Sequence, residues 1–526
     1  MSLLNINFKE IKIYNDLKTQ VSVQDNLIYS GTLLKRAYEL YSESIALISN
    51  DKIVTYKELY FRSIIVSKKL KLGGVKPHDR VLLYYENSLD FYILYFAIWQ
   101  VGAVVVPVNI FLHEKELSYI ITDSEPRVVI ASESLLPKVK TVLSSVNIIN
   151  PVVFSREIID WATQVPSGKL DDIFKNFKTY SLNQDDLCVI LYTSGTTGVP
   201  KGVMLTSKNI MTNVTQSYAR FIIYGLTLNE RFFCVLPLFH SFAQNTCMWL
   251  PIMIGAQIIV ISKIDRKLIL EGLKHKPTVF FGFPALYGLL CLMKTAPLDS
   301  VKLFVSGADM LPDKIRAAFG MVYGRKIAAG YGLTETSPVV ALNHINQDND
   351  TRCAGSPLVG IECDIRNDIN ESLPFGVTGT LWLKGDNISS GYYKSPDITK
   401  KFIHEGWLNT GDLAYFDYNG NIYISGRTKD IIIHKGFNIY PAEIENILLR
   451  HPAVIKAAVI GQVDDETGQI PVAFVAIKVH EKNLEESLRQ LCLHNLAPYK
   501  IPKKFICLDD LPMNATGKVD KKQLHI

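Results

Sequence analysis

Apolar residues between about positions 55 and 340 form short β-branched runs separated by longer stretches with helical spacing. The runs include RVLLYY, AVVVPV, RVVIAS, QIIVIS and VKLFVSG. Strands that alternate with helices are typical of parallel sheets covered by helices. We therefore expect a large N-terminal domain of parallel α/β layers.

One uncharged stretch, FYILYFAIWQVGAVVVPV at 91–108, is long enough to imitate a membrane span. Gln100, Gly102 and Pro107 interrupt its apolar character. A helix, a glycine turn and a strand account for these interruptions better than one continuous span does. The stretch is therefore predicted to be a buried helix followed by a buried parallel strand.

The pattern changes twice toward the C-terminus. From about 354 to 426 it predicts short strands joined by Gly and Asn turns, as in GTLWLKG and AYFDYNGNIYISGR, which suits a small β-barrel-like subdomain. After Gly426 a new alternation of strand, helix and strand begins. We predict an N-terminal domain at 1–427 and a small α+β domain at 428–526, and a mobile C-terminal domain would have to move at a short hinge near Lys429.

Composition narrows the classes of function. The 526 residues, 48% of them hydrophobic, can form roughly two to four domains. The 56 basic and 51 acidic residues are spread along the chain, so no basic tract predicts nucleic-acid binding, and the net charge of +5 allows only a mild attraction to anionic surfaces. The eight cysteines have no C-x-x-C spacing and the N-terminus has no signal-peptide core, which predicts a cytoplasmic protein, with peripheral membrane contact left open.

A glycine- and hydroxyl-rich segment, LYTSGTTGVPKGVM at 191–204, follows a predicted buried strand at Leu187–Tyr192. Glycines let a backbone approach a ligand closely, hydroxyls donate hydrogen bonds, and a lysine supplies positive charge, so the segment is a candidate polyphosphate loop. It differs from a Walker loop, which ends in Gly-Lys-Ser/Thr, and an ordinary Gly/Thr-rich turn is the alternative. The candidate residues are Thr193, Ser194, Gly195, Thr196, Thr197, Gly198 and Lys201.

Five further stretches accompany this loop in a fixed order. They are LPLFHSFAQN (236–245), GYGLTETSP (330–338), GWLNTGDLAYFD (406–417), GRTKDIIIHKGFNIYPAEIE (426–445) and NATGKVD (514–520). Together they resemble the adenylate-forming superfamily of acyl-CoA synthetases, aryl-CoA ligases, luciferases and peptide-synthetase adenylation domains. The resemblance runs from about residue 30 to 520 and is strongest to a fatty-acid–CoA ligase.

The resemblance implies a ligase that makes a carbon–sulfur bond in two steps. A carboxylate attacks the α-phosphorus of ATP and releases pyrophosphate, and a thiol then attacks the acyl-adenylate and expels AMP. ATP, Mg²⁺ and coenzyme A are the implied cofactors. Both steps concentrate negative charge on oxygens, so catalysis is expected to depend on positioning and electrostatic stabilisation.

The resemblance also assigns roles to residues around the nucleotide. The loop would hold the β- and γ-phosphates, with Thr193 near the metal. Tyr331 would stack on adenine, Thr334 would bond to the α-phosphate, and Glu335 would bind Mg²⁺, a cation that prefers carboxylate and phosphate oxygens. Outside such a motif, a glutamate like Glu335 is more often a solvated surface acid.

Three further residues are assigned from the later motifs. Asp412 would accept hydrogen bonds from both ribose hydroxyls, although an isolated Asp after Gly is more often a turn residue. Arg427 would make a second ribose or phosphate contact. Lys518 would approach the α-phosphate during adenylation and is the principal catalytic candidate, although lysines near a chain end are usually solvated.

His240 and the segment after Lys429 complete the assignment. His240 would shape the mouth of the acyl pocket, whereas a lone histidine among aromatic residues is more often a packed core residue. Lys435 and Gly436 would face a tunnel for the thiol. Many relatives have lysine where Ile433 stands and glutamine where Asn438 stands, so this segment departs from the usual pattern.

The acyl pocket is expected between the helix after FHSF and the strands that end at VSGAD and AAGYG. Small residues at its back, Gly330 and Ala308, predict a deep apolar slot that recognises an acid by burial. The segment FAQNTCMWLP has no carboxylate to hold an amino group, which disfavours amino acids. The predicted walls are His240, Phe242, Phe283, Ala308, Ala329 and Gly330.

These features favour a medium- or long-chain fatty acid as substrate. A cinnamate- or benzoate-type aryl acid is the alternative, because aliphatic and aromatic pockets use the same residue types. Coenzyme A is the favoured acceptor over an acyl carrier protein, since the segment before the hinge is too compact for the insertion typical of acyl-AMP ligases. An inactive relative that only binds is the non-enzyme alternative. Oligomeric state and exact chain length are left open.

Overall fold

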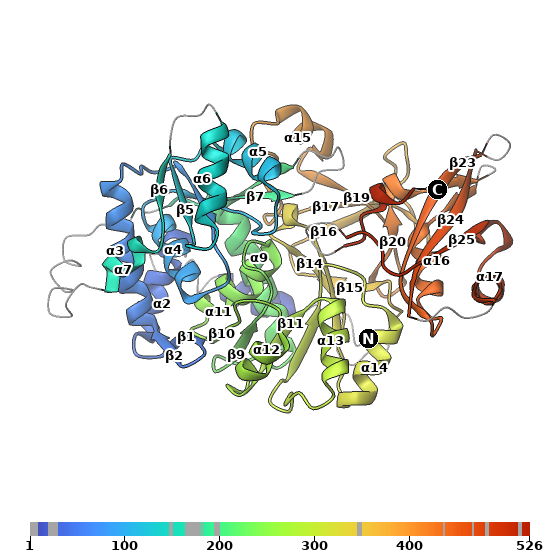
Figure 1. Ribbon diagram of the computed structural model, residues 1–526, viewed down its shortest axis with the longest axis horizontal. Coiled ribbons are helices and arrows are strands. Elements are labelled where there is room, and N and C mark those ends of the chain that lie inside the picture. Colours follow the sequence, from blue (N-terminus) through green and yellow to red (C-terminus); the bar gives the residue numbers. More distant parts are fainter. Residues whose placement is uncertain are drawn as a thin grey trace.

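The computed structural model describes residues 9–18, 30–146, 151–163, 180, 182–193, 200–344, 350–434, 437–464, 468–478, 483–513 and 518–525. Three sheets organise these residues, and helices cover the faces of the two N-terminal sheets (Figure 1). The α/β class with a smaller C-terminal unit is as predicted.

The first sheet has six strands in the order β6-β5-β3-β4-β7-β8. All its pairings are parallel except that of β7 with β8, which form an antiparallel hairpin. The strands are β3 (Arg80–Tyr84), β4 (Val104–Pro107), β5 (Val128–Ala131), β6 (Val152–Phe154), β7 (Leu187–Thr193) and β8 (Lys201–Thr206), and the nearby helices are α3 (Tyr56–Leu72), α4 (Leu89–Gln100), α5 (Glu114–Ser124), α6 (Leu136–Ser145) and α7 (Glu157–Thr163).

The uncharged stretch at 91–108 is confirmed as a buried helix and strand. Residues 91–100 of α4 are buried, and β4 is buried along its whole length between β3 and β7. Gly102 turns the chain between them with φ +77°, and a Cβ there would lie 2.5 Å from the Tyr180 ring. No helix in the described part of the chain is both long and apolar enough to cross a membrane.

The second sheet has a parallel layer between the antiparallel edge strand β2, which pairs with β1, and a run of antiparallel strands that begins at β14. Strands β1, β10, β9, β11, β12 and β13 pair in parallel, and β14 then pairs antiparallel with β13. The elements are β1 (Ile45–Ser49), β2 (Lys52–Thr55), β9 (Arg231–Cys234), β10 (Gln257–Val260), β11 (Val279–Gly282), β12 (Leu303–Ser306), β13 (Ala328–Gly332), β14 (Val339–Leu342), α2 (Leu33–Tyr41), α9 (Ser207–Ile223), α10 (Ser241–Gln244), the π-helical turn η2 (Asn245–Trp249), α11 (Leu250–Met253), α12 (Arg266–Leu273), α13 (Pro284–Met293) and α14 (Asp313–Tyr323).

The predicted β-rich region consists of antiparallel strands that continue this second sheet. The order β14-β15-β20-β19-β17-β16 joins them edge to edge, because β15 pairs with both β14 and β20. The elements are β15 (Cys353–Pro357), β16 (Glu362–Arg366), β17 (Gly379–Lys384), α15 (Pro396–Phe402), β18 (Ile403–His404), β19 (Trp407–Phe416) and β20 (Ile422–Arg427).

The C-terminal part has its own sheet and its own apolar core. Strands β22, β21, β24 and β23 are antiparallel neighbours, and β25 pairs in parallel with β24. In Figure 1 this red unit lies next to β19 and β20 and far from α3. Its elements are β21 (Ile432–His434), β22 (Phe437–Ile439), α16 (Pro441–Leu448), β23 (Val454–Asp464), β24 (Gly468–Ile477), α17 (Leu484–Asn495) and β25 (Lys504–Leu508).

Candidate active site

Three of the predicted nucleotide residues meet in one hydrogen-bonded group. Asp412 on β19 lies opposite Arg427 on β20 in the strand register, and the Arg427 Nε atom is 3.1 Å from Asp412 Oδ1. The Tyr331 hydroxyl, from the end of β13, donates to Asp412 Oδ2 at 2.6 Å. Asp412 is only 4% exposed, and Arg427 and Tyr331 together hold its carboxylate in one orientation.

The electrostatics of this group keep each partner in its usual charge state. Burial, followed by the Asp412 charge, raises the pKa of Tyr331 well above its ordinary value, so the phenol stays protonated and donates. Burial opposes the charge on Arg427, but Asp412 and other neighbours raise the pKa of Arg427 overall. A fixed carboxylate beside a half-buried aromatic ring can hold the sugar and base of a nucleotide.

The GYGLTETSP motif forms the short 3₁₀ turn η3 (Thr334–Thr336) directly after β13. The Ser241 hydroxyl of α10 lies 3.4 Å from the Thr334 hydroxyl. The Glu335 Oε1 atom accepts a hydrogen bond from the Tyr392 hydroxyl at 2.9 Å, and the Glu335 carbonyl accepts one from the Ser389 backbone at 2.8 Å. Sequence reasoning missed Tyr392, which the SSGYYK segment brings to the motif.

Buried amide side chains hold the same motif from behind. Asn213 on α9 bonds to both backbone groups of Val339, with its Nδ2 atom 2.7 Å from the carbonyl and its Oδ1 atom 2.9 Å from the amide nitrogen. Asn245 of η2 donates to the Ser337 carbonyl at 3.1 Å and to Asn213 Oδ1 at 2.9 Å. Neither asparagine was predicted from the sequence. For Asn245, an amide inside the apolar segment FAQNTCMWLP was a usable signal.

The candidate phosphate loop connects the two strands of the β7–β8 hairpin. Thr193 at the end of β7 pairs with Lys201 at the start of β8, so both predicted residues lie at the base of the loop. The Lys201 ammonium is 5.1 Å from the centroid of the Phe402 ring and 5.6 Å from that of Tyr392. The remaining predicted residues, Ser194, Gly195, Thr196, Thr197 and Gly198, lie outside the described residues.

Lys518 of the C-terminal unit acts electrostatically on His240. Burial, and secondly the Lys518 charge, lower the pKa of His240 to about 4. The imidazole, which packs against the Phe239 ring at 4.6 Å between centroids, is therefore neutral at pH 7. A neutral, packed ring suits the shaping of a pocket mouth better than it suits proton transfer.

Of the residues predicted for the hinge and the thiol tunnel, the structure describes Lys429 only. Lys429 lies in the short 3₁₀ turn η4 (Thr428–Asp430) that follows β20, where the chain passes to the C-terminal sheet. Burial is the main cause that lowers the pKa of its ammonium group. Lys435 and Gly436, predicted near the thiol tunnel, lie outside the described residues.

The residues predicted to line the acyl slot lie on, or beside the ends of, α10, β11, β12 and β13. The Phe242 ring packs against the backbone at Gly307, where an added Cβ would lie 2.9 Å from it, and meets the Phe281 ring edge-on at 6.0 Å. Phe283 is half-buried, and Ala329 is 9% exposed.

Two residues predicted at the back of the slot lie on or just after neighbouring strands of the second sheet. Ala308, just after β12, is exposed and has φ +67°. An added Cβ at Gly330 on β13 would lie 3.3 Å from the Leu342 side chain of β14. The assignment of both residues to the slot stays a prediction.

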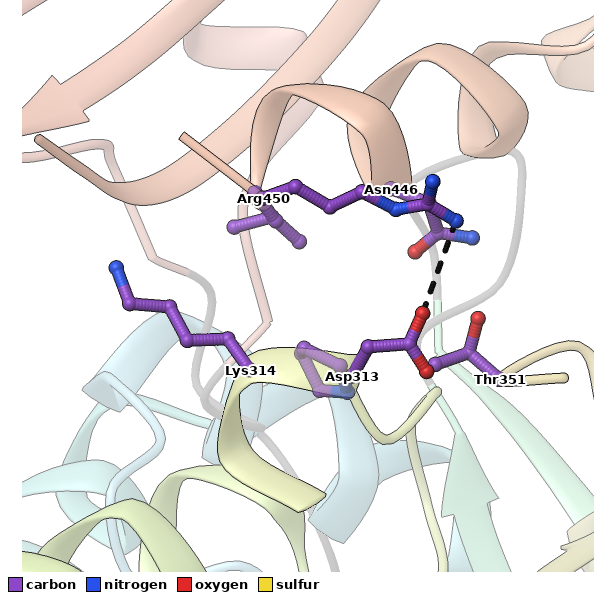
Figure 2. Close-up of a pocket in the computed structure, with 7 residues that line it drawn as sticks. Asp313, Lys314, Thr351, Asn446 and Arg450 are labelled. Atoms are coloured by element: carbon purple, nitrogen blue, oxygen red, sulfur yellow. Dashed lines mark ion pairs between the residues drawn. The ribbon is translucent and has the colours of Figure 1, made fainter. Parts of the chain in front are cut away.

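A small cleft separates α14 from α16 where the two parts of the chain meet. Figure 2 shows Asp313 and Arg450 facing each other across it, with the Arg450 Nη2 atom 3.7 Å from Asp313 Oδ2. The Lys314 ammonium donates to the carbonyls of Pro452 at 3.2 Å and Val454 at 3.4 Å. These contacts join the C-terminal unit to α14.

The residues around Glu335 fit a magnesium ion that is bound mainly through phosphate. No group of three or more His, Cys, Asp or Glu side chains able to hold a metal occurs among the described residues. Within that part of the chain, the Glu335 carboxylate has only the Tyr392 hydroxyl as a hydrogen-bond partner, so it retains lone pairs for a cation. Mg²⁺ commonly binds through one carboxylate plus substrate phosphates.

The fold and the site define an ATP-dependent enzyme that activates acids. The AMP-binding enzyme family matches residues 34–393, and the AMP-binding enzyme C-terminal domain matches residues 443–518. The chain therefore belongs to the AMP-binding enzymes, and it is an AMP-forming CoA ligase that uses ATP, Mg²⁺ and coenzyme A.

Relatives and solved structures agree with this assignment. The chain is 31% identical to a long-chain-fatty-acid–CoA ligase of Bacillus subtilis over 97% of its length and 96% of the relative, and 30% identical to 4-coumarate–CoA ligase 1 of Solanum tuberosum over 91% and 89%. ATP-bound MatB from Rhodopseudomonas palustris matches with a TM-score of 0.85 and 29% identity, covering 94% of this chain and 97% of that one. The o-succinylbenzoate CoA synthetase of Bacillus subtilis, in complex with ATP and magnesium, matches with a TM-score of 0.83 and 26% identity over 94% and 99%.

Proposed function

We propose that the enzyme activates a medium- or long-chain fatty acid as acyl-AMP and transfers the acyl group to coenzyme A. The observation that supports this choice is the apolar character of the slot beside His240, where the Phe242 and Phe281 rings and the Gly307 backbone meet. An acid without polar handles is recognised by burial, at roughly 0.8 kcal/mol per methylene. Long-chain-fatty-acid–CoA ligases among the relatives are consistent with it.

In the first step, residues of the N-terminal part would hold ATP in place. Asp412 would accept hydrogen bonds from the ribose hydroxyls, while Tyr331 packs against the base and Arg427 keeps the carboxylate oriented. Thr334 would donate to the α-phosphate. Glu335 and Thr193 would hold Mg²⁺, which supplies a positive charge that neutralises the phosphates.

Lys518 would stabilise the charge that develops as the carboxylate attacks phosphorus. Its charge is the second cause that lowers the pKa of His240, which supports a position of Lys518 near the acid side of the site. A single ammonium group on a flexible side chain can interact with both the carboxylate and the α-phosphate oxygens. We propose that residues 428–526 then rotate about Lys429, withdraw Lys518 and bring the segment with Lys435 and Gly436 to the thiol.

An aryl acid is the second candidate, and one observation favours it. The Phe242 ring itself lies against Gly307 and meets Phe281 at 86°, an edge-on arrangement that would also accept a flat aromatic ring. Relatives with aryl substrates include the 4-coumarate–CoA ligases.

A panel of carboxylic acids with ATP, Mg²⁺ and coenzyme A separates the two candidates. We expect pyrophosphate release and thioester mass with C8 to C18 acids and much weaker turnover of cinnamate and benzoate. Phe242→Ala should extend the longest acid accepted, whereas Phe375→Ala, a change at an exposed ring of the β-rich region, should leave the profile unchanged. Turnover confined to aryl acids would overturn the fatty-acid proposal, and turnover only with a carrier protein would overturn coenzyme A as acceptor.

A further inference from the structure

Tyr392 links two parts of the site that the motifs treat separately. It lies in the segment between β17 and α15, and only 7% of it is exposed. Its hydroxyl donates to Glu335 Oε1 at 2.9 Å, and the face of its ring lies 5.6 Å from the Lys201 ammonium. One side chain therefore contacts both the carboxylate expected to bind the metal and the cation expected to face the leaving phosphates.

Backbone hydrogen bonds fix Tyr392 relative to the phosphate-loop hairpin. Tyr392 forms an antiparallel bridge with Val203 of β8, the Met204 amide donates to the Gly391 carbonyl at 2.9 Å, and the Tyr393 amide donates to the Gly202 carbonyl at 2.7 Å. The segment is thus joined to β8 by an isolated bridge and these backbone hydrogen bonds. Lys201 is the first residue of β8, so backbone pairing keeps the two residues on neighbouring segments.

The chemistry of the contacts gives the two ends of Tyr392 different tasks. A phenol is protonated at physiological pH, so the Tyr392 hydroxyl donates to the carboxylate. The donor directs one oxygen of Glu335 and leaves the other available. The ring attracts Lys201 through its π electrons, as does the ring of Phe402 at 5.1 Å.

We propose that Tyr392 is a positioning residue that orients Glu335 toward magnesium through its hydroxyl and, together with Phe402, places Lys201 beside the outgoing phosphates through its ring. The inference rests on the proposed function, because it assigns the metal to Glu335 and the phosphates to Lys201. The two tasks are separable by substitution. Tyr392→Phe removes only the hydroxyl. Phe402→Leu removes one ring from Lys201 and an edge-on neighbour of the Tyr392 ring at 6.0 Å, but no hydrogen-bond donor to Glu335.

ATP binding measured by calorimetry with Mg²⁺ and with a chelator tests the two tasks without turnover. Tyr392→Phe should weaken binding of Mg·ATP about tenfold and leave metal-free ATP binding unchanged. Phe402→Leu should weaken both about threefold, because Lys201 contacts phosphate whether or not the metal is present. Tyr415→Phe, a matched loss of a hydroxyl from a tyrosine that stacks on Tyr423 in the β-rich region, should change neither.

The remaining outcomes distinguish the alternatives. The inference is overturned if Tyr392→Phe binds ATP as tightly as wild type both with Mg²⁺ and with the chelator. It is also overturned if the variant loses the same affinity with and without the metal, which would indicate a merely structural role. A shifted magnesium dependence of pyrophosphate release in Tyr392→Phe, with the ATP concentration saturating, would support the metal assignment independently. Wild-type protein that binds Mg·ATP but releases no pyrophosphate with any acid would overturn the proposed function and leave the calorimetric test of Tyr392 valid.

Discussion

The two groups of contacts that form the site differ sharply in strength. The nucleotide group lies within the N-terminal part, where Asp412 is almost fully buried and has a 2.6 Å and a 3.1 Å partner. The contact between α14 and α16 is partly exposed, and its ion pair of Asp313 and Arg450 spans 3.7 Å. Exposed pairs of this kind contribute little, typically 0–1 kcal/mol.

The difference indicates how one site can serve two reactions. A nucleotide group that is already ordered loses little entropy when ATP binds. A weak contact between the two parts would let the C-terminal unit leave at small cost, as the proposed second conformation requires. The binding half is fixed by the N-terminal fold, while the half that carries Lys518 is expected to assemble and separate in each cycle.

The largest effect is expected from breaking the nucleotide group. Asp412→Asn removes the charge that holds Arg427 and that is proposed to accept hydrogen bonds from the ribose hydroxyls. Two charge-assisted hydrogen bonds are worth about 3 kcal/mol or more. ATP affinity and pyrophosphate release should therefore fall a hundredfold or more. Calorimetry and a pyrophosphate assay check this, with the exposed Asp368→Asn as control, and an affinity within threefold of wild type would contradict the ribose assignment.

Removal of Lys518 should have the next largest effect, confined to one half-reaction. Lys518→Ala loses a charge that acts mainly on the adenylation transition state, and such losses cost about 100- to 1,000-fold in rate. Thioester formation from preformed acyl-adenylate should stay within a few-fold of wild type. Lys503→Ala, at an exposed lysine of the same unit, is the control, and equal loss of both steps would refute the assignment.

Proline at the hinge should give the opposite result. Lys429→Pro fixes φ near −65° and restricts the backbone change that rotation of residues 428–526 requires. Acyl-adenylate formation should be retained, while transfer to coenzyme A falls about tenfold or more. Lys429→Ala should keep both steps, and a proline variant with normal transfer would show that the rotation occurs elsewhere or does not occur.

A smaller effect is expected from loosening the contact between the two parts. Asp313→Asn removes the ion pair with Arg450, so it should slow adenylation by less than about fivefold and leave or slightly raise the rate of transfer. Both rates are measured at low and high salt, against the exposed Asp299→Asn. A drop in both steps beyond tenfold would mean that this contact is as strong as the nucleotide group.

The smallest expected effect is a change in the pKa of His240 when Lys518 is removed. The pKa of His240, lowered to about 4 by burial and then by Lys518, should rise in Lys518→Ala yet stay below 6.5, since burial persists. His240 is thus neutral from pH 6 to 8 and should give no inflection in the rate there. A histidine titration by NMR checks the pKa of His240, and His240→Gln identifies its signal. An unchanged His240 pKa in Lys518→Ala would mean that Lys518 does not lie near the acid side of the site.

Much of the fold follows from local pattern. The buried α4–β4 unit, the strand before the phosphate loop and the change to antiparallel strands near residue 354 all follow from periodicity and turn residues. These features depend on residues close together in sequence, so the printed order of apolar and polar positions is enough to predict them. The order of the six motifs likewise indicates the family without any knowledge of tertiary contacts.

Only the tertiary structure decided which side chains meet. Tyr331 and Asp412 are 81 positions apart, Tyr392 and Glu335 are 57 apart, and Asn213 and Val339 are 126 apart. No periodicity relates such positions, because their distances depend on how the strands pair and the helices pack. The motifs determined what chemistry the chain carries, and packing determined which groups hold the reacting ones in place.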